Sequence, residues 1–240
     1  MSESEQSFLN TYNAADYPIV LLSVDAVLLT YHEDRLKVLL VERASHPAIG
    51  CWALPGGFID QRADNQLEDA AMRSLKNKTG VAPPYIEQLG AFGSADRDPR
   101  GWSTTVAYTA LIPYAACAAH IDSVSDSQWF DVDRLKTLKL AFDHQRIIEA
   151  GIERFRQKAL YSLVTARALA EPFTLYELRR VHELLIGKTI QRKSFLRRIE
   201  SSGVLKETGE TKVIDKGRPA MLYKTRPGID DYRFVRNIDG

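Results

Sequence analysis

The 240-residue sequence is poor in cysteine: Cys51 and Cys117 are the only two, and neither belongs to a Cys-x-x-Cys pair. A zinc site built from cysteine is therefore not expected. The sequence also lacks an apolar run of about 18 residues, the length that a membrane-spanning helix requires. Its first residues are polar and acidic, which is unlike a secretory signal. We expect reduced thiols, a cytoplasmic location and no membrane partner.

Net charge is almost absent as well, at +1, but the charges are unevenly distributed. Residues 1–150 contain 13 Lys and Arg against 20 Asp and Glu, a net charge of −7, whereas residues 151–240 contain 19 against 11, a net charge of +8. Such asymmetry indicates different partners for the two parts, and a basic domain is a candidate polyanion binder. Chance clustering of solvated charges is the alternative.

The apolar periodicity predicts an N-terminal arm (1–16), a larger domain (17–150) and a smaller C-terminal domain with a connecting helix (151–240). In the larger domain we expect a helix with Asn65 as its N-cap and Glu68 as the partner in a capping box. Further elements are predicted as strands at 19–29, 36–41, 85–92, 104–112 and 128–132 and as helices at 66–79 and 144–167.

Residues 57–81 resemble the Nudix box, G-x5-E-x7-R-E-U-x-E-E-x-G-U, in which U is bulky and apolar. Four positions match the tail of the pattern: Arg73, Leu75, Gly80 and Val81. The three glutamates of that tail are replaced by Ser74, Asn77 and Lys78. The segment between the first glycine and the arginine is also two residues longer than the family spacing.

These replacements bear directly on catalysis. Nudix hydrolases cleave nucleoside diphosphates with Mg²⁺, which neutralises the diphosphate, activates water and demands oxygen ligands. Positions i, i+3 and i+4 share one helix face, and here that face offers a hydroxyl, an amide and an ammonium. The nearby carboxylates do not repeat the spacing: Asp60, Asp64, Glu68 and Asp69. We therefore expect no catalytic residues, no catalytic Mg²⁺ and no enzyme activity.

The segment 96–102, Asp-Arg-Asp-Pro-Arg-Gly-Trp, resembles the loop of a Nudix subgroup that handles ADP-ribose. Guanidinium groups pair bidentately with phosphate, and glycine allows the backbone to approach it closely. Trp102 could stack on adenine or belong to the core, and the two arginines could instead form surface ion pairs with Asp96 and Asp98. The predicted ligand-binding residues are Arg43, Gly56, Gly57, Phe58, Arg97, Asp98, Arg100 and Trp102.

Residues 174–225 predict a helix, a short turn, a second helix and a two-stranded ribbon, which is the order of a winged helix-turn-helix. The first helix opens on the capping-box pair Thr174 and Glu177 and stops before Gly187. The second is expected from Gln191 to Ser201, and its exposed side is basic. Arg, Lys and Gln read base edges or grip phosphates, and a basic wing suits the minor groove. The predicted DNA-binding residues are Thr189, Gln191, Arg192, Lys193, Ser194, Arg197, Lys216 and Arg218.

Together the two halves resemble the NrtR family, the Nudix-related transcriptional regulators of NAD metabolism, over roughly residues 17–225. The resemblance implies an α/β fold, an α+β Nudix sandwich, with a C-terminal winged helix-turn-helix domain. It also implies a repressor of NAD biosynthesis or salvage genes, with ADP-ribose or a related nucleotide as effector and double-stranded operator DNA as partner. We expect a homodimer. The alternatives are a divergent ADP-ribose pyrophosphatase with an accessory domain and a nucleotide-binding module that docks protein.

Overall fold

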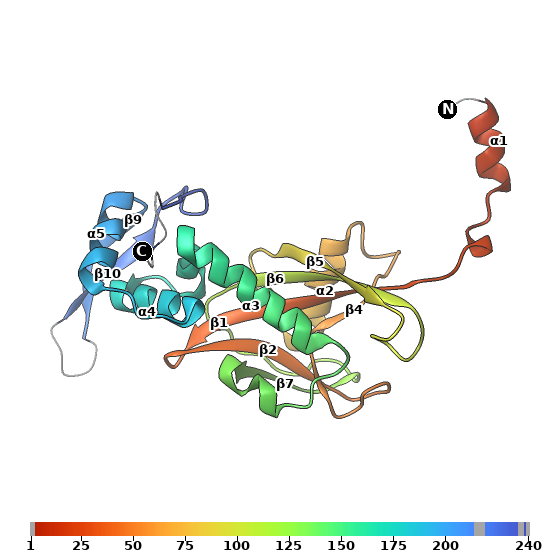
Figure 1. Ribbon diagram of the computed structural model, residues 1–240, viewed down its shortest axis with the longest axis horizontal. Helices are drawn as coiled ribbons and strands as arrows, with labels where there is room; N and C mark the ends of the chain where they lie inside the picture. The colour runs from red at the N-terminus through yellow and green to blue at the C-terminus, as the bar shows by residue number, and fades with distance from the viewer. Residues whose placement is uncertain (1–2, 214–218, 235–237, 239–240) are drawn as a thin grey trace.

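The computed structural model of the chain describes residues 3–213, 219–234 and 238. A large sheet with a helix on either face occupies the middle of the molecule, a small helical unit lies at one end, and the N-terminal segment projects from the other (Figure 1). None of the described helices is long and apolar enough to cross a lipid bilayer.

Seven strands of the described residues form the large sheet, with the order β3-β2-β1-β6-β5 and with β7 and β4 paired to β2 and β1. Their bounds are β1 (Leu21–His32), β2 (Arg35–Arg43), β3 (Trp52–Ala53), β4 (Gly56–Phe58), β5 (Glu87–Ser94), β6 (Ser103–Leu111) and β7 (Val124–Asp131). β1 runs parallel to β6 and antiparallel to β2 and β4. β1 therefore lies at the centre, with its N-terminal part against β4 and its C-terminal part against β2.

Two helices cover the two faces of this sheet, α2 (Leu67–Thr79) and α3 (His144–Tyr161). Side chains of β1 alternate between the faces, as the period of a strand requires. Val24, Ala26 and Leu28 pack in the cluster that contains α2, whereas Val27 and Leu29 pack in the cluster that contains α3. The apolar run in β1 is thus explained by burial on both sides.

Several predicted boundaries are wrong by a few residues. The N-cap of α2 is Gln66, with Asp69 as its capping-box partner, because the Asp69 carboxylate accepts from the backbone of both Asn65 and Gln66. The predicted helix 144–167 ends at Tyr161, where the Ser162 hydroxyl donates to the Lys158 carbonyl and caps the last turn. The shorter elements include three 3₁₀ turns, η1 (Ala14–Asp16), η2 (Val132–Thr137) and η3 (Val164–Ala168).

The C-terminal unit has the predicted order of helix, turn, helix and ribbon. Its elements are β8 (Phe173–Thr174), α4 (Leu175–Ile186), α5 (Arg192–Ser202), β9 (Leu205–Lys212) and β10 (Ala220–Thr225). The Thr174–Glu177 capping box is formed at α4, which ends at Gly187 with a φ of 70°. The short strand β8, which pairs with β10, was not predicted, because two residues give too little pattern.

One apolar cluster joins the two units. Ile148 and Phe155 of α3 belong to the same cluster as Leu178 and Val181 of α4. His182 lies in this region, fully buried against Thr165 and Phe195, and burial lowers its pKa to about 4. Its imidazole is therefore neutral near pH 7, as its apolar surroundings require.

The N-terminal arm is more structured and less polar than predicted. It contains α1 (Glu3–Thr11), a helix that lies far from the sheet in Figure 1. Phe8, Tyr12 and Tyr17 pack on one another with ring-centroid distances of 5.7 and 5.6 Å, and all three remain about half exposed. A nine-residue helix of this kind is marginal in isolation.

Candidate functional site

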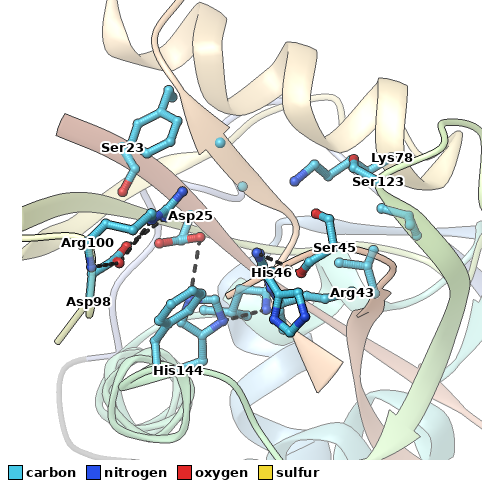
Figure 2. A pocket seen from close by; sticks show the side chains of 18 of the residues that line it. Ser23, Asp25, Arg43, Ser45, His46, Lys78, Asp98, Arg100, Ser123 and His144 are labelled. Carbon is cyan, nitrogen blue, oxygen red and sulfur yellow. Dashed lines mark hydrogen bonds and ion pairs between the residues drawn. The ribbon is translucent and has the colours of Figure 1, made fainter. Parts of the chain in front are cut away.

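A cavity of about 300 Å³ opens where β1, β2 and β4 meet the N-terminal end of α3 (Figure 2). That volume is sufficient for a small ligand. The cavity collects seven of the eight predicted ligand-binding residues: Arg43, Gly56, Gly57, Phe58, Arg97, Asp98 and Arg100. Its lining contains four cationic side chains against two carboxylates, so it favours an anionic ligand.

Trp102 is the predicted ligand residue that does not line the cavity. Its indole is half exposed, and its ring edge approaches Gly93 of β5. Trp102 immediately precedes β6, next to Ser103, whose side chain points to Arg97; neighbouring residues of an extended chain face opposite sides, so the indole is turned away. Two other aromatic faces do line the cavity, and each carries a guanidinium: Arg100 lies 5.0 Å from the Phe58 ring, and Arg43 lies 5.1 Å from the Phe142 ring.

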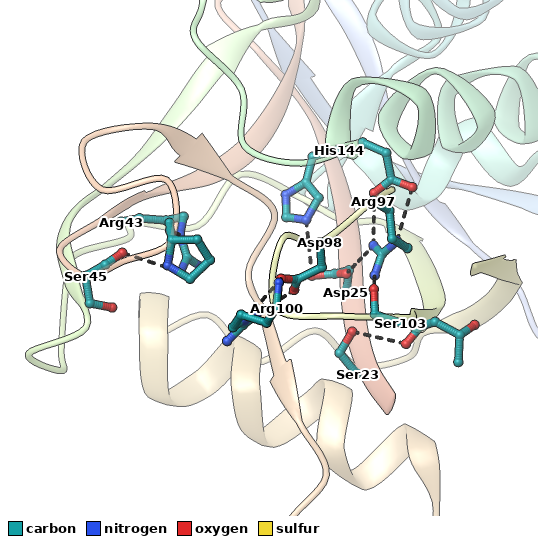
Figure 3. A network of polar contacts seen from close by, with 12 residues as sticks. Ser23, Asp25, Arg43, Ser45, Arg97, Asp98, Arg100, Ser103 and His144 are labelled. Carbon is teal, nitrogen blue, oxygen red and sulfur yellow. Dashed lines mark hydrogen bonds and ion pairs between the residues drawn. The ribbon is translucent and has the colours of Figure 1, made fainter. Parts of the chain in front are cut away.

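Arg97 has a side chain that is only 6% exposed. It donates to the Asp143 carboxylate over 2.9 and 3.3 Å and to the Ser103 hydroxyl over 3.4 Å. Its guanidinium also lies 3.9 Å from the Asp25 carboxylate (Figure 3). The predicted surface ion pairs with Asp96 and Asp98 are not its contacts. Arg97 holds the floor of the cavity together.

Arg100 is the more accessible arginine, with a side chain that is 42% exposed. The Asp98 carboxylate accepts from it over 3.0 and 2.7 Å and also accepts from its backbone N–H. These bonds hold the pKa of Asp98 below its usual range. Asp98 thus orients Arg100. The ion pair between Arg100 and Asp98, one of the alternatives that the sequence left open, is formed, and Arg100 still lines the cavity (Figure 2).

The three replaced glutamate positions on α2 differ in their surroundings. Ser74 is buried beneath Gly57, Asn77 is exposed outside the cavity, and the Lys78 ammonium reaches into the cavity (Figure 2). Burial lowers the pKa of Lys78. The cavity wall that the Nudix pattern fills with a carboxylate therefore presents a cation.

Acidic side chains near α2 have other partners. Arg73 donates to both oxygens of Asp64 over 2.7 and 2.6 Å and to the Phe58 carbonyl over 3.1 Å. This pair closes the extended loop that precedes α2. Among the residues that the structure describes, no group of three His, Cys, Asp or Glu side chains is arranged to hold a metal ion.

Asp25 and His144 line the cavity but were not among the ligand-binding residues predicted from the sequence. The backbone N–H of Leu54 donates to His144 Nδ1 over 2.8 Å, so the neutral ring carries its proton on Nε2, which lies 3.8 Å from Asp25. Burial lowers the pKa of His144 and favours this neutral form. A lone carboxylate in the apolar run of β1 was the available signal for Asp25. His144 had no signal, because its place depends on packing across the sheet.

The second candidate surface is the exposed side of α5 and the turn before it. Phe195 and Ile199 of α5 are buried, as predicted. Ser194 is half-buried, and the other predicted residues are exposed: Thr189, Gln191, Arg192, Lys193 and Arg197. No described residue forms an ion pair with Arg192, Lys193 or Arg197, which leaves these cations available to phosphates or bases. The predicted wing residues Lys216 and Arg218 lie outside the described residues.

Comparison with known proteins matches both parts of the chain. Residues 21–151 match the NUDIX domain, and residues 165–225 match the NrtR DNA-binding winged helix domain. An "ADPR responsive transcriptional repressor NtrR" of Acinetobacter baylyi is 39% identical over 236 residues, which are 98% of this chain and 94% of that protein.

Two crystal structures of Shewanella oneidensis NrtR are also similar to this chain. The complex with a 27mer DNA has a TM-score of 0.83 and 55% identity, covering 90% of this chain and 98% of that one. The NUDIX domain complexed with ADP ribose has a TM-score of 0.61 and 51% identity, covering 65% and 99%. With its NUDIX domain followed by an NrtR winged helix domain, this chain belongs to the NrtR family.

Proposed function

We propose that this chain is a transcriptional repressor that binds operator DNA through its winged helix and releases it when ADP-ribose occupies the NUDIX cavity. One observation carries the proposal: the chain combines a cation-lined cavity with a basic helix, α5, which stands at the place of the recognition helix in a winged helix-turn-helix. The two ligands crystallised with the Shewanella oneidensis relative have the matching chemistry. By the same resemblance, we propose that it regulates genes of NAD synthesis or salvage and that it is located in the cytoplasm.

The ligand contacts that we propose follow from the exposure of the cavity side chains. Arg100 and Lys78 supply positive charge to the diphosphate, and Gly57 leaves room beside it. Phe58 remains about half exposed beside Arg100 and is a candidate for stacking on the adenine. Arg97 and Asp98 act as positioning residues, since their polar atoms are engaged within the protein.

The proposed DNA contacts are tested by Arg192→Ala, at the first turn of α5. We expect DNA affinity to fall about 5- to 150-fold, or roughly 1–3 kcal/mol, if Arg192 reads a base, and the loss should be confined to one operator position. If it grips phosphate, the loss should be similar for all sequences, with a shallower salt dependence. Fluorescence anisotropy on operator DNA measures both, with the exposed Arg134→Ala of the NUDIX domain as control. Unchanged affinity would mean that another face binds DNA.

We further propose that the NUDIX domain does not hydrolyse ADP-ribose. The ammonium of Lys78 repels Mg²⁺, and the Asp64 carboxylate is engaged by Arg73. Incubation with ADP-ribose and Mg²⁺, followed by chromatography, should give no AMP above the protein-free control. Turnover at roughly 1–1000 s⁻¹ would contradict this and would favour the pyrophosphatase alternative.

A homodimer is also proposed. One recognition helix covers few base pairs, whereas two related by a two-fold axis reach sites about 34–36 Å apart. Exposed aromatic side chains on the N-terminal arm support a second copy as their partner, because monomers rarely expose such clusters. Light scattering should give twice the 27.0 kDa chain mass, and deletion of residues 1–16 should shift the protein toward monomer. A full-length protein that is monomeric with and without DNA would overturn the proposal.

A further inference from the structure

The turn between β1 and β2 touches the winged helix. Glu33 and Asp34 form this two-residue turn with φ angles of 53° and 59°, in the left-handed region that side chains other than glycine seldom adopt. The Asp34 carboxylate accepts from the Arg180 guanidinium of α4 through both oxygens, each over 3.0 Å. Tyr31 also donates to Asp34 over 3.0 Å and fixes its orientation. Left-handed φ angles at both central residues are what a two-residue type I′ hairpin turn requires.

The contact continues from Arg180 to the turn before the recognition helix. Arg180 donates to the buried Glu183 carboxylate over 3.1 Å, and Arg179 donates to its other oxygen over 2.7 Å. That oxygen also accepts from the backbone N–H of Ile190 over 3.0 Å, two residues before α5 begins. Hydrogen bonds of charged side chains therefore run without interruption from the β1–β2 turn to Ile190, in the turn before α5.

The other end of the same hairpin forms the cavity. Asp25 of β1 and Arg43 of β2 both line it, and each is nine residues from Asp34. At about 3.4 Å per residue this is a distance of roughly 30 Å, spanned by two strands in a sheet. The hairpin is thus a stiff connection between the cavity and α4. Figure 1 shows α4 beside the turn that joins β1 to β2.

A second connection runs beside the first. α3 begins at His144 in the cavity, and its Arg156 donates to the Leu185 carbonyl of α4 over 3.1 Å. Asp34, Arg156 and Leu184 border one hollow between the hairpin, α3 and α4. Movement of the winged helix against the NUDIX domain must change the geometry of this junction, and the only charged contact of the hairpin with α4 that the structure describes there is Asp34 with Arg180.

We propose that Asp34 and Arg180 are positioning residues that transmit occupancy of the cavity to the recognition helix. The inference rests on the proposed function, since it assumes that one ligand changes the affinity for the other. Coupling between two sites requires an element with two arrangements that both ligands bias, and in this proposal the two arrangements are the ion pair formed and the ion pair broken. Neither residue touches ADP-ribose or DNA in this account.

The test compares Asp34→Asn with Glu33→Gln. Asparagine tolerates the left-handed backbone and keeps the shape of the side chain while removing its charge. Glu33 is the matched control, because it lies in the same turn but pairs with Lys37 inside the hairpin. For each variant, DNA affinity is measured with and without saturating ADP-ribose, and ADP-ribose affinity is measured without DNA.

The measured quantity is the ratio of the DNA affinity without ADP-ribose to the DNA affinity with saturating ADP-ribose. Asp34→Asn should reduce this ratio about two- to tenfold relative to the unmodified chain, and Glu33→Gln should leave it unchanged. Arg180→Gln should act like Asp34→Asn, and the double variant should add little to either, since both remove one contact. ADP-ribose affinity of the DNA-free protein should change less than twofold. A ratio in Asp34→Asn equal to that of the unmodified chain would overturn the inference and leave the proposed function standing. A ratio of one in the unmodified chain would overturn both.

Discussion

Replacing Arg97 by alanine should lower the free energy of unfolding by about 3–5 kcal/mol, because it leaves buried carboxylates without their cation. The Asp25 and Asp143 side chains are 9% and 20% exposed, and Arg97 is the guanidinium that lies within 4 Å of both. In the sequence Arg97 was expected to contact the ligand. The structure gives it internal partners, so loss of ADP-ribose binding should accompany loss of stability.

Urea denaturation monitored by circular dichroism measures this difference. Arg134→Ala is the control, because the Arg134 side chain is 74% exposed and its partner Asp131 keeps Arg35 and Lys37 within 4 Å. That control should change the free energy of unfolding by less than about 1 kcal/mol and leave ADP-ribose binding intact. If Arg97→Ala unfolds like the unmodified protein but fails to bind ADP-ribose, Arg97 is a ligand contact after all.

Gly56→Ala should destabilise the protein by about 3 kcal/mol or more, at the upper end of what overpacking costs. A methyl group at Gly56 would lie 2.3 Å from the Val24 carbonyl oxygen and 2.9 Å from the Asp25 Cα, both of them backbone atoms of β1. Backbone at the centre of a sheet cannot move aside without breaking the pairing of β4 with β1. The cavity loses its shape at the same time, because Asp25 is part of its lining.

Gly57→Ala is the control for this substitution. A methyl group there would meet only the Ser74 hydroxyl, at 3.3 Å, which a small shift relieves. Thermal unfolding of the two variants should therefore differ widely, with Gly57→Ala close to the unmodified protein. Equal unfolding temperatures for Gly56→Ala and Gly57→Ala would show that β1 and β4 do not pack as described. Gly56 is thus required for the close approach of β4 to β1, whereas the sequence had suggested that both Gly56 and Gly57 contact phosphate.

Local pattern predicted much of this molecule. The match of 57–81 to the Nudix box, the Thr174–Glu177 capping box and the buried stripe of α5 all depend on residues a few positions apart, and all three are supported by the structure or the comparisons. The N-cap of α2 was misplaced by one residue, because Asn65 and Gln66 both precede an acidic residue at a suitable distance and only the folded backbone chooses between them.

What could not be predicted depends on contacts between distant segments. Asp25 and His144 are 119 positions apart and meet only because α3 crosses the face of β1 beside the cavity. Arg97 pairs with Asp143, 46 positions away, in preference to the aspartates beside it in the loop. The contact of Asp34 with Arg180 requires the orientation of one domain on the other, which no periodicity contains.

The central claim is that ADP-ribose in the NUDIX cavity makes the winged helix release DNA. The most direct test is to titrate operator DNA with the protein at zero and at saturating ADP-ribose. A typical coupling of about 1–3 kcal/mol predicts that ADP-ribose weakens DNA binding about 5- to 150-fold. Reciprocity requires operator DNA to weaken ADP-ribose binding by the same factor, which calorimetry on the complex measures. DNA affinity that is the same at both concentrations of ADP-ribose, with the nucleotide bound in the cavity, would contradict the account.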